Sequence, residues 1–354
     1  MKRSINIQGR PIGSGYPTYV IAEISANHNQ SFEQAAELIK VAKGAGADAV
    51  KLQTYTPDTL TIDSRSEYFQ IKKGSLWEGR NLHDLYAEAY TPWDWQPRLK
   101  VIADELGIAL FSSPFDATAV EFLESMNVPA YKIASFEIVD LALIEKVAQT
   151  GKPLILSTGM ANLAEIEEAV RTARKAGATE IVLLKCTSAY PSLPNEMNLR
   201  TIAHLSQAFD LPVGLSDHTM GFTVPVAAVA LGACVVEKHI TLSRDTPGPD
   251  SAFSLEPQEL KALVEAVRVA EEALGEVRYE VTDREEASKV FRRSLFVVRD
   301  VKAGQIFTAE NVRSIRPAHG LAPRYLNIVL GRQAARDVAA GTPVSWDIIG
   351  DGRM

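Results

Sequence analysis

The sequence lacks several features that mark specialised classes of protein. Its 354 residues include only two cysteines, Cys186 and Cys234, which cannot form a disulfide framework. No stretch approaches the ~18 consecutive apolar residues of a membrane-spanning helix, and residues 1–6 have no apolar segment typical of a secretory signal. We therefore expect a reduced, cytoplasmic compartment and no membrane partner. The net charge of −7 argues against nucleic acid as a partner.

The composition that is present is that of a globular protein. Hydrophobic residues make up 46% of the chain and charged residues 23%, which excludes disordered, collagenous and coiled-coil proteins. The length exceeds one typical domain of about 100–200 residues. We therefore expect more than one domain.

Predicted strands alternate with predicted helices through most of the chain. Nearly continuous apolar segments predict strands at residues 19–24, 49–54, 108–113, 130–135, 153–158, 181–186, 213–217 and 235–240. Amphipathic segments predict helices at residues 31–45, 117–126, 141–150, 164–176, 201–209, 223–231 and 257–274. Strands that are apolar on both faces are typical of parallel sheets, and eight strand–helix units match a TIM (β/α)8 barrel. A doubly wound open sheet is the alternative fold. No GxGxxG or Walker A motif follows a predicted strand, which argues against nucleotide binding.

Two regions depart from this alternation. Residues 58–90 form a long insertion after the second predicted strand, and insertions of this length are commonly functional lids or loops. The polar run 282–289 predicts a linker. We therefore expect a barrel domain at 1–281 and a small β-rich domain at 290–354, with short strands at 294–298 and 344–349.

Polar side chains end nearly every predicted strand, at the edge where the active site of a barrel lies. Strand by strand they include Glu23, Asn27 and His28; Lys51 and Gln53; Ser112 and Ser113; Lys132, Ser135 and Glu137; Ser157 and Thr158; Thr187, Ser188 and Tyr190; Ser216, Asp217 and His218; and Glu237, Lys238 and His239. A capping hydroxyl or a solvated charge explains each one singly, but not the whole set. Two lysines from strand ends, together with serines from four strand ends, predict a phosphate site.

Two histidines and two glutamates in this set suggest further chemistry. His218 and His239 end adjacent predicted strands, so their imidazoles could share one divalent ion. Two neutral imidazoles suit Mn, Fe, Co or Zn, and carboxylates or water could complete an octahedral Mn site. Glu23 and Glu137 are candidates for general acid–base chemistry or for positioning a water molecule.

Ordered motifs along the chain resemble those of the sialic acid synthase family. They are AEISANH at 22–28, KLQTY at 51–55, FSSPFD at 111–116, YKIASFE at 131–137, KCTS at 185–188, GLSDH at 214–218 and EKH at 237–239. Within that family they are most similar to the motifs of pseudaminic acid synthases. The resemblance covers almost the whole chain, because residues 291–350 are similar to the antifreeze-like (SAF) domain that ends these enzymes.

The resemblance implies a metal-dependent condensation of phosphoenolpyruvate with the open-chain aldehyde of an N-acetylated amino sugar. The products would be a nine-carbon 2-keto sugar acid and phosphate. His218 and His239 would bind Mn²⁺, or Mg²⁺ or Co²⁺, as a Lewis acid. Glu23 and Glu137 would orient or deprotonate the water that attacks C2. The residues that would hold phosphoenolpyruvate are Lys51, Ser113, Lys132, Ser135, Ser157 and Ser216.

The resemblance also implies a domain-swapped homodimer. The residues that would face the sugar are Gln53, Ser188, Tyr190 and Asp250. Phe291 and Arg316 of the antifreeze-like domain would reach the sugar site of the other subunit.

The chain departs from many bacterial sialic acid synthases at two positions. They carry Asn where this chain has Ser188, and a small residue where it has Phe136. Both departures argue against N-acetylmannosamine as the substrate. We therefore expect 2,4-diacetamido-2,4,6-trideoxy-L-altrose as the amino sugar, which gives pseudaminic acid. The alternatives within the family are an N-acetylneuraminate or legionaminic acid synthase and a spore-coat polysaccharide synthase.

Two other hypotheses place the chain in different classes. A barrel aldolase would use Lys132 or Lys185 to form a Schiff base and would not need a metal. An ice- or carbohydrate-binding protein would act through its C-terminal domain alone. The complete set of polar strand ends argues against this last hypothesis.

Overall fold

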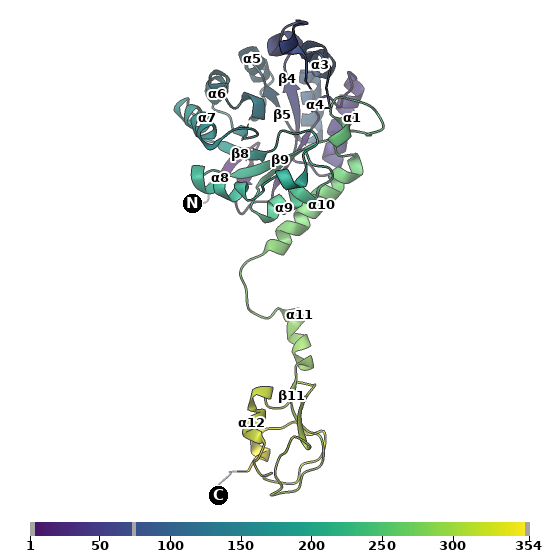
Figure 1. Ribbon diagram of the computed structural model, residues 1–354, viewed down its shortest axis with the longest axis vertical. Helices are drawn as coiled ribbons and strands as arrows, with labels where there is room; N and C mark the ends of the chain where they lie inside the picture. Colours follow the sequence, from purple (N-terminus) through teal and green to yellow (C-terminus); the bar gives the residue numbers. More distant parts are fainter. Residues whose placement is uncertain (1–3, 73–75, 351–354) are drawn as a thin grey trace. The chain divides into compact units, whose positions relative to one another are not determined.

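All eight predicted strands are present and close into a parallel barrel (Figure 1). They are β3 (Tyr19–Glu23), β4 (Ala49–Thr54), β5 (Ala109–Pro114), β6 (Tyr131–Ile133), β7 (Leu154–Ser157), β8 (Ile181–Cys186), β9 (Val213–Asp217) and β10 (Val235–His239). Each strand pairs with the next in chain order, and β10 pairs with β3 to close the circle. The TIM barrel prediction is confirmed. The doubly wound alternative is wrong, because an open sheet would leave two strand edges unpaired.

The structure, a computed structural model, describes residues 4–72 and 76–350. Residues 1–3, 73–75 and 351–354, from the predicted N-terminus, insertion and second domain, lie outside the described residues. The chain divides into two units, Met1–Gly275 and Glu276–Met354. No helix in the described ranges is long and apolar enough to cross a membrane.

Helices that follow the strands cover the outside of the barrel (Figure 1). They are α1 (Phe32–Gly44), α4 (Gln96–Leu106), α5 (Ala117–Ser125), α6 (Leu141–Ala148), α7 (Leu163–Lys175), α8 (Thr201–Phe209), α9 (Thr223–Ala230) and α10 (Pro257–Leu274). Polar side chains begin several of them; Asn162 and Glu165 form a capping box on α7 that satisfies its first N–H groups. Helix α4 was not predicted, because only Leu99 and Ala103 form its buried apolar face.

The strands are apolar throughout because the barrel buries both of their faces. Every residue of β3 is buried. Val20 and Ala22 pack in a cluster with Leu38 of α1, whereas Tyr19 and Ile21 belong to a second apolar cluster. Alternate side chains of a strand point to opposite faces, so one set faces the helices and the other faces the barrel interior.

An N-terminal hairpin was also not predicted from the sequence. It consists of β1 (Ser4–Ile7) and β2 (Arg10–Gly13), which pair antiparallel. Its isoleucines Ile5, Ile7 and Ile12 are buried in the same cluster as Tyr19, the first residue of β3.

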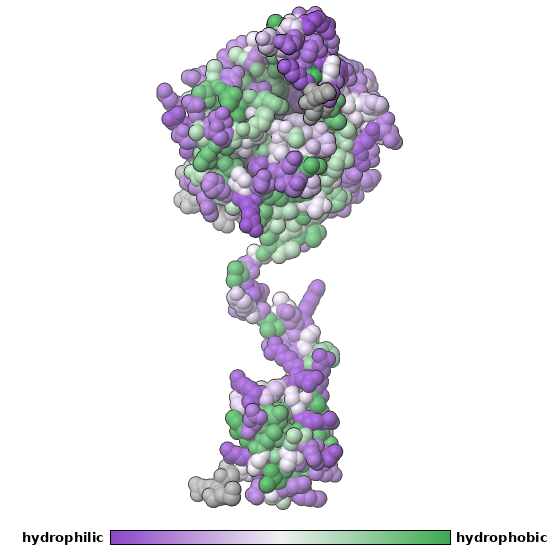
Figure 2. Space-filling view, in the orientation of Figure 1, coloured by the Kyte–Doolittle hydropathy of each residue, from purple (hydrophilic) through white to green (hydrophobic). Residues whose placement is uncertain are grey.

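The predicted insertion follows β4, whose carboxyl end faces the site described below. Its described part contains α2 (Pro57–Leu60), a 3-10 turn at Glu67–Phe69 and α3 (Leu82–Ala89). The surface over this region is hydrophilic at the top of Figure 2. The insertion is therefore a separate segment with a polar outer surface, beside the carboxyl ends of the strands.

The second unit has its own small apolar core. β11 (Ser294–Val297) and β12 (Val312–Ile315) pair antiparallel, and the short helices are α11 (Asp283–Glu286) and α12 (Leu326–Val329). The core includes Leu295, Val297, Phe307 and Val312. The predicted strand at 344–349 is wrong, because a 3-10 turn occupies Trp346–Ile348. The buried residues there are Val344 and Ile348, four apart as in a helical turn.

Candidate active site

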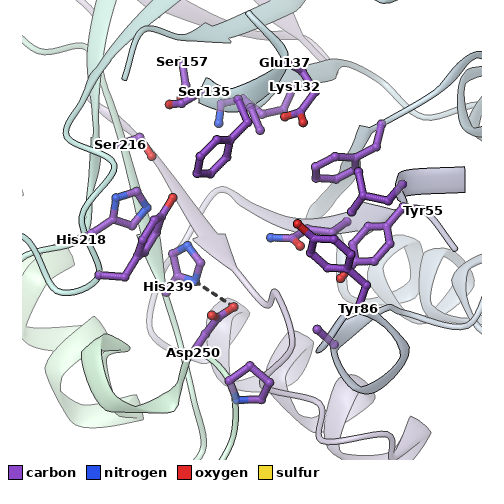
Figure 3. Close-up of a pocket in the computed structure, with 18 of the residues that line it drawn as sticks. Tyr55, Tyr86, Lys132, Ser135, Glu137, Ser157, Ser216, His218, His239 and Asp250 are labelled. Carbon is purple, nitrogen blue, oxygen red and sulfur yellow. Dashed lines mark ion pairs between the residues drawn. The ribbon is translucent and has the colours of Figure 1, made fainter. Parts of the chain in front are cut away.

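A cavity of about 480 Å³ lies at the carboxyl ends of the barrel strands (Figure 3). The predicted site residues that line it are Lys51, Gln53, Lys132, Ser135, Glu137, Ser157, Tyr190, Ser216, His218, His239 and Asp250. The strand alternation explains this gathering. Lys51 and Gln53 are two residues apart on β4, so both point inward.

A buried ion-pair network joins two lysines and one glutamate of the cavity lining to a second glutamate behind it. The Glu237 Oε1 atom lies 3.0 Å from Lys132 Nζ and 3.3 Å from Lys51 Nζ, and it accepts a hydrogen bond of 3.0 Å from Ser216 Oγ. The Glu23 Oε2 atom lies 3.1 Å from Lys51 Nζ. The lysines are thus held in place by carboxylates before any anionic substrate arrives.

The two lysines differ in how firmly they hold their protons. Burial by itself lowers the pKa of Lys51, but the carboxylates of Glu23 and Glu237 outweigh burial and raise it. Burial lowers the pKa of Lys132, although Glu237 opposes this change. Lys51 is therefore the firmer positive charge for an anionic substrate.

Two carboxyl groups beside these lysines have pKa values close to neutrality. Burial raises the pKa of Glu23 to about 7, against the opposing charge of Lys51. Burial also raises the pKa of Glu137 to about 7. Glu137 Oε2 is buried and has no hydrogen-bond partner within the described part of the chain. Groups with such pKa values can exchange protons near pH 7.

The two predicted histidines lie together at one side of the cavity, with ring centroids 5.2 Å apart. His218 Nδ1 is 3.1 Å from the Thr187 carbonyl oxygen, which places the proton on Nδ1 and leaves Nε2 free to bind a ligand. His239 Nδ1 is buried without a hydrogen-bond partner among the described residues and lies 4.0 Å from Asp250 Oδ2.

This histidine pair could supply two imidazole ligands to a divalent ion. Burial lowers the pKa of His239 well below its usual range, so its imidazole is neutral. Within residues 4–72 and 76–350, no group of three or more His, Cys, Asp and Glu side chains forms a complete metal site.

Apolar side chains line the opposite part of the cavity. Those from the insertion are Leu60, Ile71, Trp77, Leu82, Leu85, Tyr86 and Ala89, joined by Tyr55, Phe115 and Phe136. Trp77 Nε1 donates a hydrogen bond of 3.0 Å to the Pro249 carbonyl oxygen, and its ring lies 5.5 Å from the Tyr190 ring. The insertion thus covers the end of the cavity that carries Asp250.

A polar chain links the acid–base side of the cavity to Asp250. Gln53 Nε2 donates hydrogen bonds of 3.1 Å to Glu23 Oε1 and 3.2 Å to Ser25 Oγ. Ser25 in turn donates to Asp250 Oδ2. Ser25 has a left-handed backbone with φ of 49°, which is unusual for a residue other than glycine and is often found at functional sites.

Several predicted residues lie outside the cavity lining. Glu23 and Ser113 stand behind it in contact with Lys51, with Ser113 Oγ 3.4 Å from Lys51 Nζ. Ser188 Oγ lies 3.8 Å from Cys186 Sγ. Phe291 and Arg316 belong to the second unit, where both side chains are exposed.

Besides the apolar wall, the lining residues to which the sequence prediction gave no role include Glu237 and Cys186. Glu237 lies two positions before His239 on β10, so strand alternation should have placed both in the cavity. Cys186 lies at the end of β8, with its Sγ 3.9 Å from His218 Nδ1. Its apolar strand gave no signal of a site.

The fold and the site together are those of a (β/α)8 barrel whose cavity has a lysine–serine side, a histidine pair and an apolar wall. The chain belongs to the NeuB family, whose sequence model matches residues 38–279, and a SAF domain matches residues 292–349. The resemblance to sialic acid synthases is confirmed, and the chain is an enzyme of that type.

Three relatives illustrate the similarity. A pseudaminic acid synthase of Helicobacter pylori is 45% identical, over 94% of this chain and 98% of that protein. An N,N'-diacetyllegionaminic acid synthase of Legionella pneumophila is 36% identical, over 96% of this chain and 97% of that protein. The crystal structure of an N-acetylneuraminic acid synthetase from Leptospira borgpetersenii has a TM-score of 0.73 and 31% identity, covering 81% of this chain and 95% of that one.

Proposed function

We propose that the chain condenses phosphoenolpyruvate with the open-chain aldehyde of an N-acetylated amino sugar. The observation that carries this proposal is one cavity that holds a lysine–serine side, a histidine pair and an apolar wall. An anionic three-carbon substrate fits the lysine–serine side, and a carbonyl oxygen fits the histidine pair. The methyl groups of an acetylated sugar fit the apolar wall.

The chain's residues have separate tasks in this reaction. Lys51 and Lys132 bind the phosphate and carboxylate of phosphoenolpyruvate, with hydroxyl donors from Ser135, Ser157 and Ser216. The C2=C3 π electrons of phosphoenolpyruvate form the bond from C3 to the aldehyde carbon, whose oxygen takes a proton and becomes a hydroxyl group, and C2 is left electron-deficient. A water molecule then adds at C2 and loses one proton to a carboxylate. The bond from C2 to the phosphate oxygen breaks, the proton of the remaining C2 hydroxyl passes to the departing phosphate, and C2 becomes a ketone.

The carboxyls of Glu137 and Glu23 are the groups for these proton transfers. Both have a pKa of about 7, so each can accept or donate a proton near neutral pH. Glu137 faces the cavity, which favours it as the group that deprotonates the water. Glu23 contacts Lys51 and Gln53 behind the lining, which favours an orienting role.

We propose that His218 and His239 hold a divalent ion, with Mn²⁺ preferred over Mg²⁺ and Co²⁺. When bound there, such an ion supplies Lewis-acid polarisation of the aldehyde oxygen. The unpartnered Nδ1 atom of His239 supports this assignment. Asp250, 4.0 Å from that atom, orients the ring or binds a sugar hydroxyl.

We propose the 2,4-diacetamido-2,4,6-trideoxy sugar as the amino sugar and pseudaminic acid as the product. The similarity to pseudaminic acid synthases supports this choice, as does the apolar wall that includes Phe136 and Trp77. A methyl group at C6 would pack on such a wall, whereas a hydroxyl group there would lack a partner.

We propose that the working unit is a cytoplasmic homodimer in which Phe291 and Arg316 reach the other subunit's sugar site. Several apolar side chains near the start of the second unit support an additional partner surface. Val277 is 91% exposed, Tyr279 97% and Phe291 62%, and a second copy of the chain would cover them. Both cysteines are free, in keeping with a reducing compartment.

A product assay tests the proposed reaction. The protein is incubated with phosphoenolpyruvate and a panel of N-acetylated sugars, and the products are identified by mass spectrometry. The expected result is a nine-carbon 2-keto acid together with an equal amount of phosphate. Consumption of no sugar in the panel would contradict the proposal.

The lowered pKa of Lys132 keeps a Schiff-base aldolase as a second candidate. Lys185 is a weaker candidate, because its Nζ donates hydrogen bonds to the Cys186 carbonyl oxygen and to Thr187 Oγ1. An aldolase would be inactivated by borohydride in the presence of its carbonyl substrate and would be indifferent to chelators. The proposed synthase would behave in the opposite way in both tests.

A further inference from the structure

A buried ion pair lies directly behind the two histidines. Lys238 Nζ is 2.5 Å from Asp217 Oδ2, and both side chains are 0% exposed. The two residues are register partners on the adjacent strands β10 and β9. Each immediately precedes one of the histidines, and alternation turns their side chains away from the cavity that His218 and His239 line.

The pair also fixes the turn that carries His218. Asp217 accepts hydrogen bonds from Thr219 Oγ1 at 3.0 and 2.9 Å and from the Thr219 backbone N at 3.3 Å. Lys238 donates to the Thr219 carbonyl oxygen. The residues on both sides of His218, Asp217 and Thr219, therefore bond to Lys238 of β10, the strand that ends in His239.

Stability alone is a poor explanation for this arrangement. Removing two charges from water costs several kcal/mol per ion, and replacing a buried ion pair by apolar residues is often neutral or stabilising. Burial lowers the pKa of Lys238, and Asp217 opposes this change. An apolar pair could not form the hydrogen bonds that join the ends of β9 and β10.

We propose that Asp217 and Lys238 are positioning residues that set the spacing of His218 and His239 and thereby the affinity for the divalent ion. This inference rests on the proposed metal site. Neither residue lines the cavity, so each acts through the histidine that follows it. Outer residues that orient metal-binding histidines typically change metal affinity by about 10–100-fold when they are replaced.

The test is Mn²⁺ binding by the full-length, metal-stripped protein, measured from the electron paramagnetic resonance signal of free Mn²⁺. The D217N/K238M double variant removes both charges, so no unpaired charge is left buried. We expect its affinity for Mn²⁺ to fall by about 10-fold or more. Activity should need correspondingly more Mn²⁺ for half-saturation, while kcat at saturating Mn²⁺ recovers much of the wild-type value.

A milder variant and a matched control separate positioning from stability. Thr219→Val removes the hydroxyl that bonds Asp217 without changing charge, and should lower Mn²⁺ affinity in the same direction by a smaller factor. Asp48→Asn removes a buried carboxylate that pairs with Arg10 beside the start of β4, at the opposite end of the barrel. It should lower the melting temperature and leave Mn²⁺ affinity unchanged.

Two results would overturn the inference, and only the second would also overturn the proposed metal site. Wild-type Mn²⁺ affinity in folded D217N/K238M or, should that variant not fold, in Thr219→Val would overturn this inference alone. A wild-type protein that binds no Mn²⁺ and condenses its substrates after chelation would overturn the metal site as well. The condensation reaction would stand in that case.

Discussion

Lys132 and Glu237 form an ion pair of 3.0 Å across the barrel interior, although they lie 105 residues apart. Their strands, β6 and β10, stand four positions apart in the circle of eight and are therefore opposite one another. Both side chains are almost fully buried. One carboxylate thus joins two sides of the barrel and holds both lysines of the site.

Replacing this carboxylate should destabilise the free enzyme. In Glu237→Gln the two buried lysines lose the charge that they share, and breaking a buried pair from one side typically costs about 3–5 kcal/mol. Denaturant unfolding should report a loss of this size. Phosphoenolpyruvate should raise the melting temperature of the variant more than that of the wild type, because its negative charge replaces the missing one. An unchanged free energy of unfolding would contradict this account of the network.

Removing either histidine should abolish turnover and leave the barrel folded. His218→Ala and His239→Ala each delete one of two imidazole ligands, and circular dichroism should show a wild-type spectrum for both. EDTA should inactivate the wild type and added Mn²⁺ should restore it. Full activity after exhaustive chelation would exclude the metal site.

The sequence predicted most of the fold because its signals are local. Most residues of the barrel strands are apolar, and polar residues stand at or just beyond the carboxyl ends of nearly all of them. The positions of the strands and the end of the barrel that carries the site could therefore be inferred together. The sequence placed His218 and His239 near each other because neighbouring strands in a barrel end at the same edge, and both side chains line the cavity.

The contacts that the sequence did not reveal depend on closure of the barrel. The pairing of Lys132 with Glu237 requires the circle of strands, which no local pattern encodes. The hydrogen bond from Trp77 to Pro249 joins residues 172 apart through two loops of irregular structure. Glu237 stands among the polar residues near the end of β10, but no local pattern indicates that its carboxylate reaches lysines of two other strands.

The rate should depend on pH through Glu137, whose pKa is about 7. If its carboxylate deprotonates the water, kcat/KM should fall by about tenfold per pH unit below this pKa. Glu137→Gln should be slow at every pH and should lack this acidic limb. Because burial disfavours the ionised form, the same variant should also melt at a higher temperature than the wild type at pH 8. If the acidic limb persists in Glu137→Gln, the limb would instead be due to Glu23.

Removing the second unit should leave a folded barrel without activity. Truncation within residues 282–289 cuts the chain beyond the first unit, Met1–Gly275, which has its own core. Activity should collapse, because the proposed contribution of Arg316 is lost. A truncated barrel with wild-type kcat/KM would remove the second unit from the reaction.

Mixed dimers test which subunit Arg316 serves. Arg316→Ala and Glu137→Ala should each be inactive alone, but after subunit exchange some activity should return, because a heterodimer would contain one intact composite site. Demonstrated exchange without recovery would mean that Arg316 acts in its own subunit or not at all.

The choice of sugar should favour the trideoxy compound over N-acetylmannosamine. An apolar pocket alone discriminates by about 10–200-fold, whereas a site that bonds the second acetamido group can reject its absence by roughly 10⁴ or more. We therefore expect a large ratio of kcat/KM values, of which Phe136→Ala removes only the smaller, apolar part. Val139→Ala is the matched control, because Val139 is as exposed as Phe136 but does not line the cavity. Equal or better use of N-acetylmannosamine by the wild type would place the chain among the general sialic acid synthases and leave Phe136 without a role in selecting the sugar.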